Sequence, residues 1–153
     1  MPGLKKTIEI AAPPEVVRAK FLDWQQIPNY HPDGFFKTIK PADPSKPLEV
    51  GDKLILELQP MSFTPKLIEN SPNRFRWLGS LPGVFTGEHN FSYEPSKTTP
   101  GGTTFSQWEE FSGILSFLMG EGALAKWYGM REQSATGWEK FNQDLKKFCE
   151  ESK

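Results

Sequence analysis

Short segments in which hydrophobic and polar residues alternate predict β-strands along much of the chain. The first such segment, LKKTIEI, ends at Ala11-Ala12-Pro13-Pro14, where the prolines stop a strand. After a gap, further alternating segments are separated by turn residues such as Val50-Gly51-Asp52. The expected strands are residues 4–10, 35–40, 52–59, 62–69, 74–80, 85–93 and 103–111.

The C-terminal segment has a helical period instead. A mostly apolar stripe recurs at intervals of three and four from Leu124 to Phe148, interrupted by Arg131 and Ser134, and charged residues occupy the other side, which predicts one long amphipathic helix. Two shorter helical segments are expected at residues 15–22 and 23–30, the first opened by Pro14. Ser134 and Gly137 lie on or beside the inward stripe of the long helix, so we expect this helix to cover a space.

This order of elements predicts an α+β fold. One strand, two short helices, about six strands and a long helix suit a curved antiparallel sheet of six to seven strands wrapped around the C-terminal helix. The chain has 153 residues, the size of one domain, and nothing in it repeats or marks a linker. We therefore expect a single domain over residues 1–153.

Composition and charge argue against some classes of partner and location. The net charge is -1 and the pI is about 6.1, which argues against a nucleic-acid partner. No apolar run approaches the roughly 20 residues of a membrane-spanning helix, so no integral membrane segment is expected. The single cysteine, Cys149, is expected to be a partly buried structural thiol and fits a reducing compartment. These features predict a cytoplasmic protein.

The segment GEHNFSY places one of only two histidines, His89, on the same strand face as Phe91 and Tyr93. Two registers are open for its pairing with the strand that follows. The facing set is either Phe105, Gln107, Glu109 and Phe111, which is the more apolar match, or Thr104, Ser106, Trp108 and Glu110. In the first register His89 lies near Gln107 and Glu109 among aromatic side chains. His89 can then be a structural residue satisfied by the carboxylate, a ligand contact or a proton-transfer group.

Other polar residues allow similar alternatives. Arg131 on the inward side of the long helix can pair with a glutamate or hold an anionic ligand group. Trp77 is core or pocket wall. His31 precedes a proline in a loop, and we expect it to be exposed. Two distant histidines and one cysteine offer no ligand spacing, so no metal site is expected.

Several segments together resemble the helix-grip superfamily called SRPBCC. They are IEIAAPPEVVRAKFLDWQQIPNY, VGDKLILEL, FRWLGSLPGVFTGEHNFSYEP, GGTTFSQWEEFSGIL and GWEKFNQDLKKFCEE. The superfamily includes START lipid-transfer domains, the birch-pollen allergen family and the polyketide cyclase/dehydratase family, to which the pattern is most similar. Where many relatives have a tryptophan after the second short helix, this chain has Asn29-Tyr30-His31-Pro32.

The resemblance implies a deep hydrophobic cavity between sheet and helix, and no cofactor. The leading hypothesis is a protein that binds a small hydrophobic molecule, lipid-like or aromatic, in this cavity. The candidate ligand-binding residues are Trp77, His89, Phe91, Tyr93, Gln107, Glu109, Arg131, Ser134 and Trp138.

Two alternatives remain open. The first is a cyclase- or dehydratase-like enzyme in which His89 or Glu109 is the catalytic base, and Arg131 or Tyr93 stabilises an enolate. The second is an interaction domain similar to the Hsp90 activator, which would need an exposed apolar or charged patch.

Overall fold

The computed structural model describes residues 5–32, 34–58, 62–81, 85–112 and 121–151. Side chains are described for these residues except 58, 62–63, 80–81, 85–87, 110–112 and 121–134. The described elements are, in chain order, β1 (Lys5–Ile10), α1 (Pro14–Leu22), the 3-10 helix η1 (Trp24–Gln26), α2 (Ile27–Tyr30), β2 (Phe36–Pro41), β3 (Leu54–Leu58), β4 (Ser62–Phe63), β5 (Lys66–Asn70), β6 (Arg74–Leu81), β7 (Phe85–Pro95), β8 (Thr103–Ser112) and α3 (Glu121–Glu151). The predicted α+β fold with a long C-terminal helix is confirmed.

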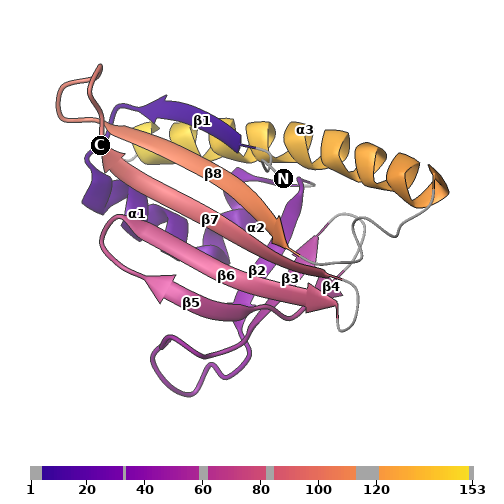
Figure 1. Cartoon of the computed structure of the whole chain (residues 1–153). Coiled ribbons are helices and arrows are strands. Elements are labelled where there is room, and N and C mark those ends of the chain that lie inside the picture. Colours follow the sequence, from indigo (N-terminus) through magenta and orange to yellow (C-terminus); the bar gives the residue numbers. More distant parts are fainter. Residues whose placement is uncertain (1–4, 33, 59–61, 82–84, 113–120, 152–153) are drawn as a thin grey trace.

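The described strands form two antiparallel sheets. Five strands pair in the order β1-β8-β7-β6-β5, and three pair in the order β2-β3-β4. An isolated bridge between Lys53 and Lys66 links the two sheets. Figure 1 shows the larger sheet in front, with α3 running behind its upper edge along β1.

The segment expected as one strand, residues 62–69, is divided between the two sheets. β4 ends at Phe63 and pairs with β3, whereas β5 begins at Lys66 and pairs with β6. Pro65 lies between them and has no backbone N–H to donate to a ladder. Its carbonyl accepts a hydrogen bond from the N–H of Leu54 at 2.9 Å. The proline therefore marks the point where the chain moves from one sheet to the other.

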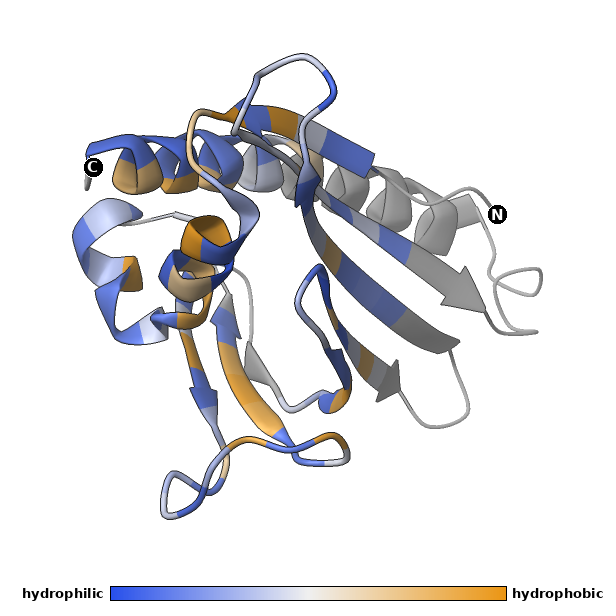
Figure 2. Ribbon diagram, turned by 90° about the vertical axis from the view of Figure 1, so that its left-hand side faces the viewer, coloured by the Kyte–Doolittle hydropathy of each residue, from blue (hydrophilic) through white to orange (hydrophobic). Residues whose placement is uncertain are grey.

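Aromatic side chains from both sheets and from the helices make up much of the core. Phe21 of α1 is fully buried and lies 4.6 Å, between ring centroids, from Phe91 of β7 and 6.4 Å from Phe141 of α3. Figure 2 shows hydrophilic residues on the outer side of the C-terminal half of α3 and hydrophobic ones on its inner side. The amphipathic pattern of this helix thus docks it on the aromatic core.

Phe35 lies directly against Gly137 of α3. A Cβ atom on Gly137 would lie 2.5 Å from the Cβ atom of Phe35 and 2.6 Å from its ring. The ring of Phe36 follows at 5.0 Å from that of Phe141. The small residue at position 137 therefore accommodates an aromatic side chain of the protein itself.

His31 is buried, so the prediction that it is exposed was wrong. Its Nδ1 atom lies 2.7 Å from Oδ2 of Asp144, and its ring packs edge-on against Phe141 at 5.1 Å. Lys140 donates to the other oxygen of Asp144 at 2.9 Å. The loop was correctly located, but α3 covers it. Burial lowers the pKa of His31, and the hydrogen bond to Asp144 opposes that shift.

Cys149 is buried near the end of α3, as a structural thiol should be, with 1% of its surface exposed. Burial raises the pKa of the Cys149 thiol to about 12.

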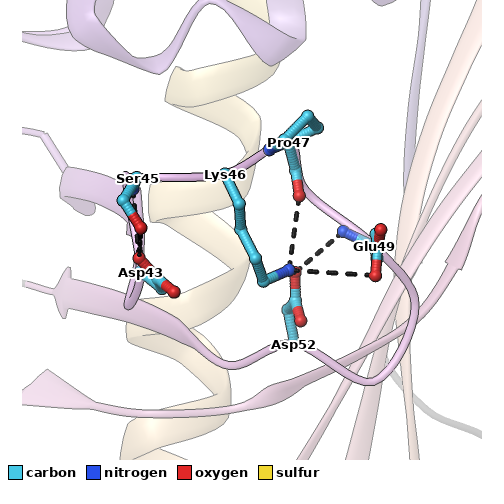
Figure 3. Close-up of polar contacts among 6 residues, drawn as sticks. All are labelled: Asp43, Ser45, Lys46, Pro47, Glu49 and Asp52. Atoms are coloured by element: carbon cyan, nitrogen blue, oxygen red, sulfur yellow. Dashed lines mark hydrogen bonds and ion pairs between the residues drawn. The ribbon is translucent and has the colours of Figure 1, made fainter.

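The connection between β2 and β3 is held together by its own polar residues (Figure 3). The ammonium group of Lys46 donates to Asp52 and lies 3.9 Å from Glu49. Asp52 also accepts the backbone N–H of Glu49 at 2.9 Å. Gly51 turns the chain here with a φ of 100°, which residues with a side chain rarely adopt. These contacts shape a surface loop and contribute nothing to the aromatic core.

The first strand is tied to the β7–β8 loop and to α3. The carboxylate of Glu9 accepts hydrogen bonds from Ser96 and Thr104, and its carbonyl accepts one from Lys146 at 2.9 Å. Ala11 donates its N–H to the carboxylate of Glu150 at 2.8 Å.

Candidate functional site

The pairing of β7 with β8 puts His89 directly opposite Glu109. Phe91 lies opposite Gln107 in the same ladder, and on the other side Trp77 of β6 pairs with His89. Residues that face one another across an antiparallel pair share a sheet face. The register is therefore the more apolar of the two that the sequence left open.

Four aromatic rings pack against the imidazole of His89, a residue of which only 4% is exposed. The ring stacks on Phe91 with centroids 4.5 Å apart, and Trp138 of α3 meets it edge-on at 4.7 Å. Trp77 lies at 5.1 Å and Phe36 of β2 at 6.0 Å. These four rings, which we call the aromatic cage, come from β2, β6, β7 and α3. The cage removes one side of the imidazole from water.

A chain of buried hydrogen bonds leads from His89 to α3. Nε2 of His89 lies 3.0 Å from Oε1 of Gln107, and Nε2 of Gln107 donates to Oδ1 of Asn142 at 2.6 Å. Gln107 is fully buried, and 2% of Asn142 is exposed. Because buried polar groups without partners are costly, this chain satisfies side chains that would otherwise destabilise the core. It also fixes the orientation of the imidazole.

The second ring nitrogen of His89 faces a carboxylate. Nδ1 lies 3.8 Å from Oε1 of Glu109, too far for a hydrogen bond but close enough for an ion pair if the ring is protonated. The side chain of Glu109 is 27% exposed, against 5% for that of His89. Glu109 therefore lies where the packed interior meets more open surroundings. An imidazole nitrogen and a carboxylate in this position can contact a polar ligand group or exchange a proton with it.

Three other predicted site residues, Trp77, Phe91 and Trp138, meet at His89, but Tyr93 does not. Tyr93 lies four residues further along β7, about 13 Å at the usual rise per residue. It is fully buried, and its ring lies 6.1 Å from that of Phe21. Burial raises the pKa of the Tyr93 hydroxyl to about 12. Phe91 lies between Tyr93 and His89 on the same face of β7.

Arg131 and Ser134 belong to α3, but their side chains lie outside the described residues. Their places in the helix are seven and four residues before Trp138.

Asn142 was missed in the sequence, although a signal for it was present. It follows Trp138 by four residues and precedes Cys149 by seven, so all three share a flank of α3. An amide on a flank that also carries a tryptophan and a cysteine indicates a buried polar group. What this spacing could not supply is its partner on β8.

The sequence matches, over residues 1–145, the family described as "Polyketide cyclase / dehydrase and lipid transport". The chain belongs to this family. No curated protein was found to match it.

Several solved structures share the fold of this family member, although their sequences are less than 20% identical to it. A START superfamily protein from Mycobacterium smegmatis is 17% identical, with 100% of both chains covered and a TM-score of 0.64. A protein from Thermus thermophilus is 15% identical, with 99% of both chains covered and a TM-score of 0.64. A protein from Chromobacterium violaceum is 17% identical, with 98% of this chain and 99% of that chain covered and a TM-score of 0.62.

Family and fold together confirm the resemblance to the START-like SRPBCC superfamily. They fit a superfamily of ligand-binding proteins. Within the part of the chain that the structure describes, no helix of this family member is long and apolar enough to cross a membrane.

Proposed function

We propose that the protein binds a small hydrophobic molecule, aromatic or lipid-like, between the larger sheet and α3. The observation that carries the proposal is the setting of His89, which combines an aromatic cage with a nitrogen that faces the partly exposed Glu109. Sites for small molecules typically combine apolar walls with a few placed polar groups.

In this proposal the aromatic cage supplies most of the binding free energy. Trp77, Phe91 and Trp138, which pack on His89, would form the apolar wall against which an aromatic or aliphatic ligand lies. His89 and Glu109 orient its polar end. Arg131 and Ser134, two turns and one turn before Trp138 in α3, remain candidate contacts, and Gln107 acts by holding His89.

The test begins with native mass spectrometry of the protein purified from its source cells, followed by extraction and identification of any bound molecule. Stripped protein is then titrated with aromatic and fatty compounds while tryptophan fluorescence is followed. Glu109→Gln should alter affinity for polar-headed ligands, whereas Glu139→Gln, on the exposed side of α3, should not. A protein that carries no molecule and responds to none of the compounds would contradict the proposal.

A second candidate is an enzyme of the cyclase or dehydratase kind, favoured by the 3.8 Å separation of His89 and Glu109. His89 Nδ1 or the Glu109 carboxylate would take the proton from a carbon next to a carbonyl. The electrons of the broken C–H bond would then form the enolate, whose oxygen needs a hydrogen-bond donor. His89→Ala and Glu109→Gln should abolish turnover and leave binding largely intact. Full turnover in both variants would exclude this mechanism.

No observation favours an Hsp90-activator-like role. Among the residues whose side chains are described, Val50 is the one large hydrophobic side chain that is exposed. A single exposed valine does not make the apolar patch that such a role needs. A cytoplasmic location is part of our proposal and rests on the single buried thiol. Cell fractionation with an antibody against the protein would test it.

A further inference from the structure

The side-chain amide of Gln107 has a defined orientation. Nitrogen and oxygen of such an amide are usually assigned from their partners, because they look alike. The backbone carbonyl of Trp138 can only accept a hydrogen bond, so it favours the amide nitrogen on its side, although at 3.5 Å from Nε2 of Gln107 it is a weak partner. Oδ1 of Asn142, at 2.6 Å from the same nitrogen, is the second acceptor. Two acceptors on one side fix the amide nitrogen toward α3 and the amide oxygen toward β7.

This orientation decides which nitrogen of His89 carries hydrogen in the neutral ring. Oε1 of Gln107 can only accept, so Nε2 of His89, at 3.0 Å, must be the N–H that donates to it. The other nitrogen, Nδ1, then holds a lone pair. It faces Oε1 of Glu109, which is also an acceptor, at 3.8 Å. Two acceptors meet there without a hydrogen between them.

We infer that Asn142 and Gln107 are positioning residues that hold His89 in the Nε2–H tautomer. Nδ1 of His89 and the carboxylate of Glu109 are then both acceptors, and they select aromatic ligands with a donating hydroxyl group, such as phenols and enols. The second half of this inference rests on the proposed function. It deepens that function by naming the chemical class of the ligand. The aromatic cage accounts for the ring, and the pair of acceptors accounts for the hydroxyl.

The preference for a hydroxyl over an ether follows from hydrogen bonding, because a hydroxyl group can donate a hydrogen and an ether oxygen can only accept one. A phenol or enol hydroxyl donates its hydrogen to Nδ1 of His89 or to the carboxylate of Glu109. An ether oxygen in the same place would bring a third acceptor to two existing ones. Sites that hydrogen-bond a hydroxyl discriminate strongly against analogues that lack it. We expect the hydroxyl compound to bind at least about tenfold more tightly than its methyl ether.

The tautomer can be measured without any ligand. The chain has only two histidines, so ¹⁵N-histidine labelling of the full-length protein gives a simple NMR spectrum, and His89→Gln assigns the signals. We expect the Nε2–H pattern for the neutral ring of His89. An Nδ1–H pattern for the neutral ring would overturn the inference whatever the protein binds.

Variants test whether Asn142 sets this state. Asn142→Leu removes the acceptor and frees the Gln107 amide to turn, so His89 should show a mixture of tautomers. Asn142→Asp keeps an acceptor oxygen and should restore the Nε2–H pattern. Thr103→Val is the matched control, because it removes a buried hydrogen bond, to the Ala12 carbonyl, that has no link to His89. An unchanged tautomer in Asn142→Leu would overturn the positioning role. If Asn142→Leu does not fold, Gln107→Met, which removes the oxygen that faces Nε2 of His89, should abolish the preference for the Nε2–H form, and an unchanged pattern would overturn the role.

Binding is then compared for 2-naphthol, 2-methoxynaphthalene and naphthalene by calorimetry on the wild type and on Asn142→Leu. Preference for 2-naphthol in the wild type, reduced in the variant, supports the inference. Equal affinity for all three overturns the ligand class but leaves the proposed function standing. Binding of none of them contradicts the proposed function, and the ligand class falls with it, whereas the tautomer result is unaffected.

Discussion

Gly137 of α3 packs so closely against Phe35, just before β2, that a Cβ atom on the glycine would lie 2.5 Å from the Cβ atom of the phenylalanine. Atoms of this kind do not approach so closely, and the obstacle is near the backbone and not at the end of a flexible side chain. The two residues are 102 positions apart in the chain. Their contact joins the segment before β2 to α3.

We expect Gly137→Ala to destabilise the protein by about 1–2 kcal/mol, even though alanine favours a helix by about 1 kcal/mol over glycine. The overpacking against Phe35 outweighs the gain in propensity. Urea unfolding followed by circular dichroism measures the difference. The exposed position Gln143 supplies the control, because Gln143→Ala should be more stable than Gln143→Gly there. If alanine were more stable than glycine at position 137 by as much as it is at position 143, the close contact would be refuted.

The buried His31 should make stability fall as the pH is lowered. Burial lowers its pKa in the folded protein below the ordinary value of 6.5. Below 6.5 the unfolded chain therefore binds a proton that the folded protein binds less readily, and the free energy of unfolding decreases. This loss begins as the pH falls through 6.5 and continues until the lowered pKa of the folded state is reached.

His31→Gln removes that proton and should reduce the loss. Urea unfolding at about pH 7.5 and about pH 5 would give the pH dependence of each protein. His89 is common to both, so its effect cancels in the comparison. An equal loss of stability in wild type and variant would mean that His31 is not titrating as its burial requires.

Gln107→Leu should destabilise the protein by about 2–4 kcal/mol, because it leaves both His89 and Asn142 without their buried partner. A double-mutant cycle with His89→Phe tests the reason. In the His89→Phe background one of the two orphaned groups is already gone, so Gln107→Leu should cost at least about 1 kcal/mol less. Strictly additive changes would show that the two side chains are not coupled.

Cys149 should react very slowly with thiol reagents in the folded protein. With a pKa of about 12, only about one thiol in 10,000 is ionised at pH 8, and the thiolate is the reactive form. Iodoacetamide labelling followed by mass spectrometry measures the rate, and labelling should become fast in urea. Val50→Cys in a Cys149→Ser background places a thiol at an exposed position and is the matched control. Equal labelling rates for the two folded proteins would contradict the burial of Cys149.

Local patterns predicted most of the helices and strands and one side of the site, but not the division of residues 62–69 between two sheets. The period of two in the strands predicted that His89, Phe91 and their facing residues share a sheet face, and the more apolar register is the one found. The period of the long helix predicted α3. Both follow from neighbours a few residues apart, which is the range over which side-chain periodicity acts.

Contacts between distant segments escaped the same reasoning. His31 was predicted to be exposed because it precedes a proline in a loop, yet its partner Asp144 lies 113 residues away on the charged side of the long helix. Nothing near Gly137 in the sequence indicated that Phe35 lies against it. Asn142 carries no local sign of the glutamine it holds. Each depends on how α3 is placed against the rest of the molecule, which periodicity does not specify.

The pairing of β1 with β8 also sets an order of events during synthesis. Ile10 of β1 pairs with Thr103, and Lys5 with Trp108, so the ladder of β1 lacks its partner until β8 has been made. At typical translation rates that interval is roughly 5 to 20 s. During it the apolar side chains of β1, such as Ile8 and Ile10, lack β8 and α3, the strand and the long helix that contact β1 in the folded protein. The nascent chain thus carries an unpaired strand for most of its time on the ribosome, and the two lysines that begin this strand, Lys5 and Lys6, are the kind of charge that protects such edges from aggregation.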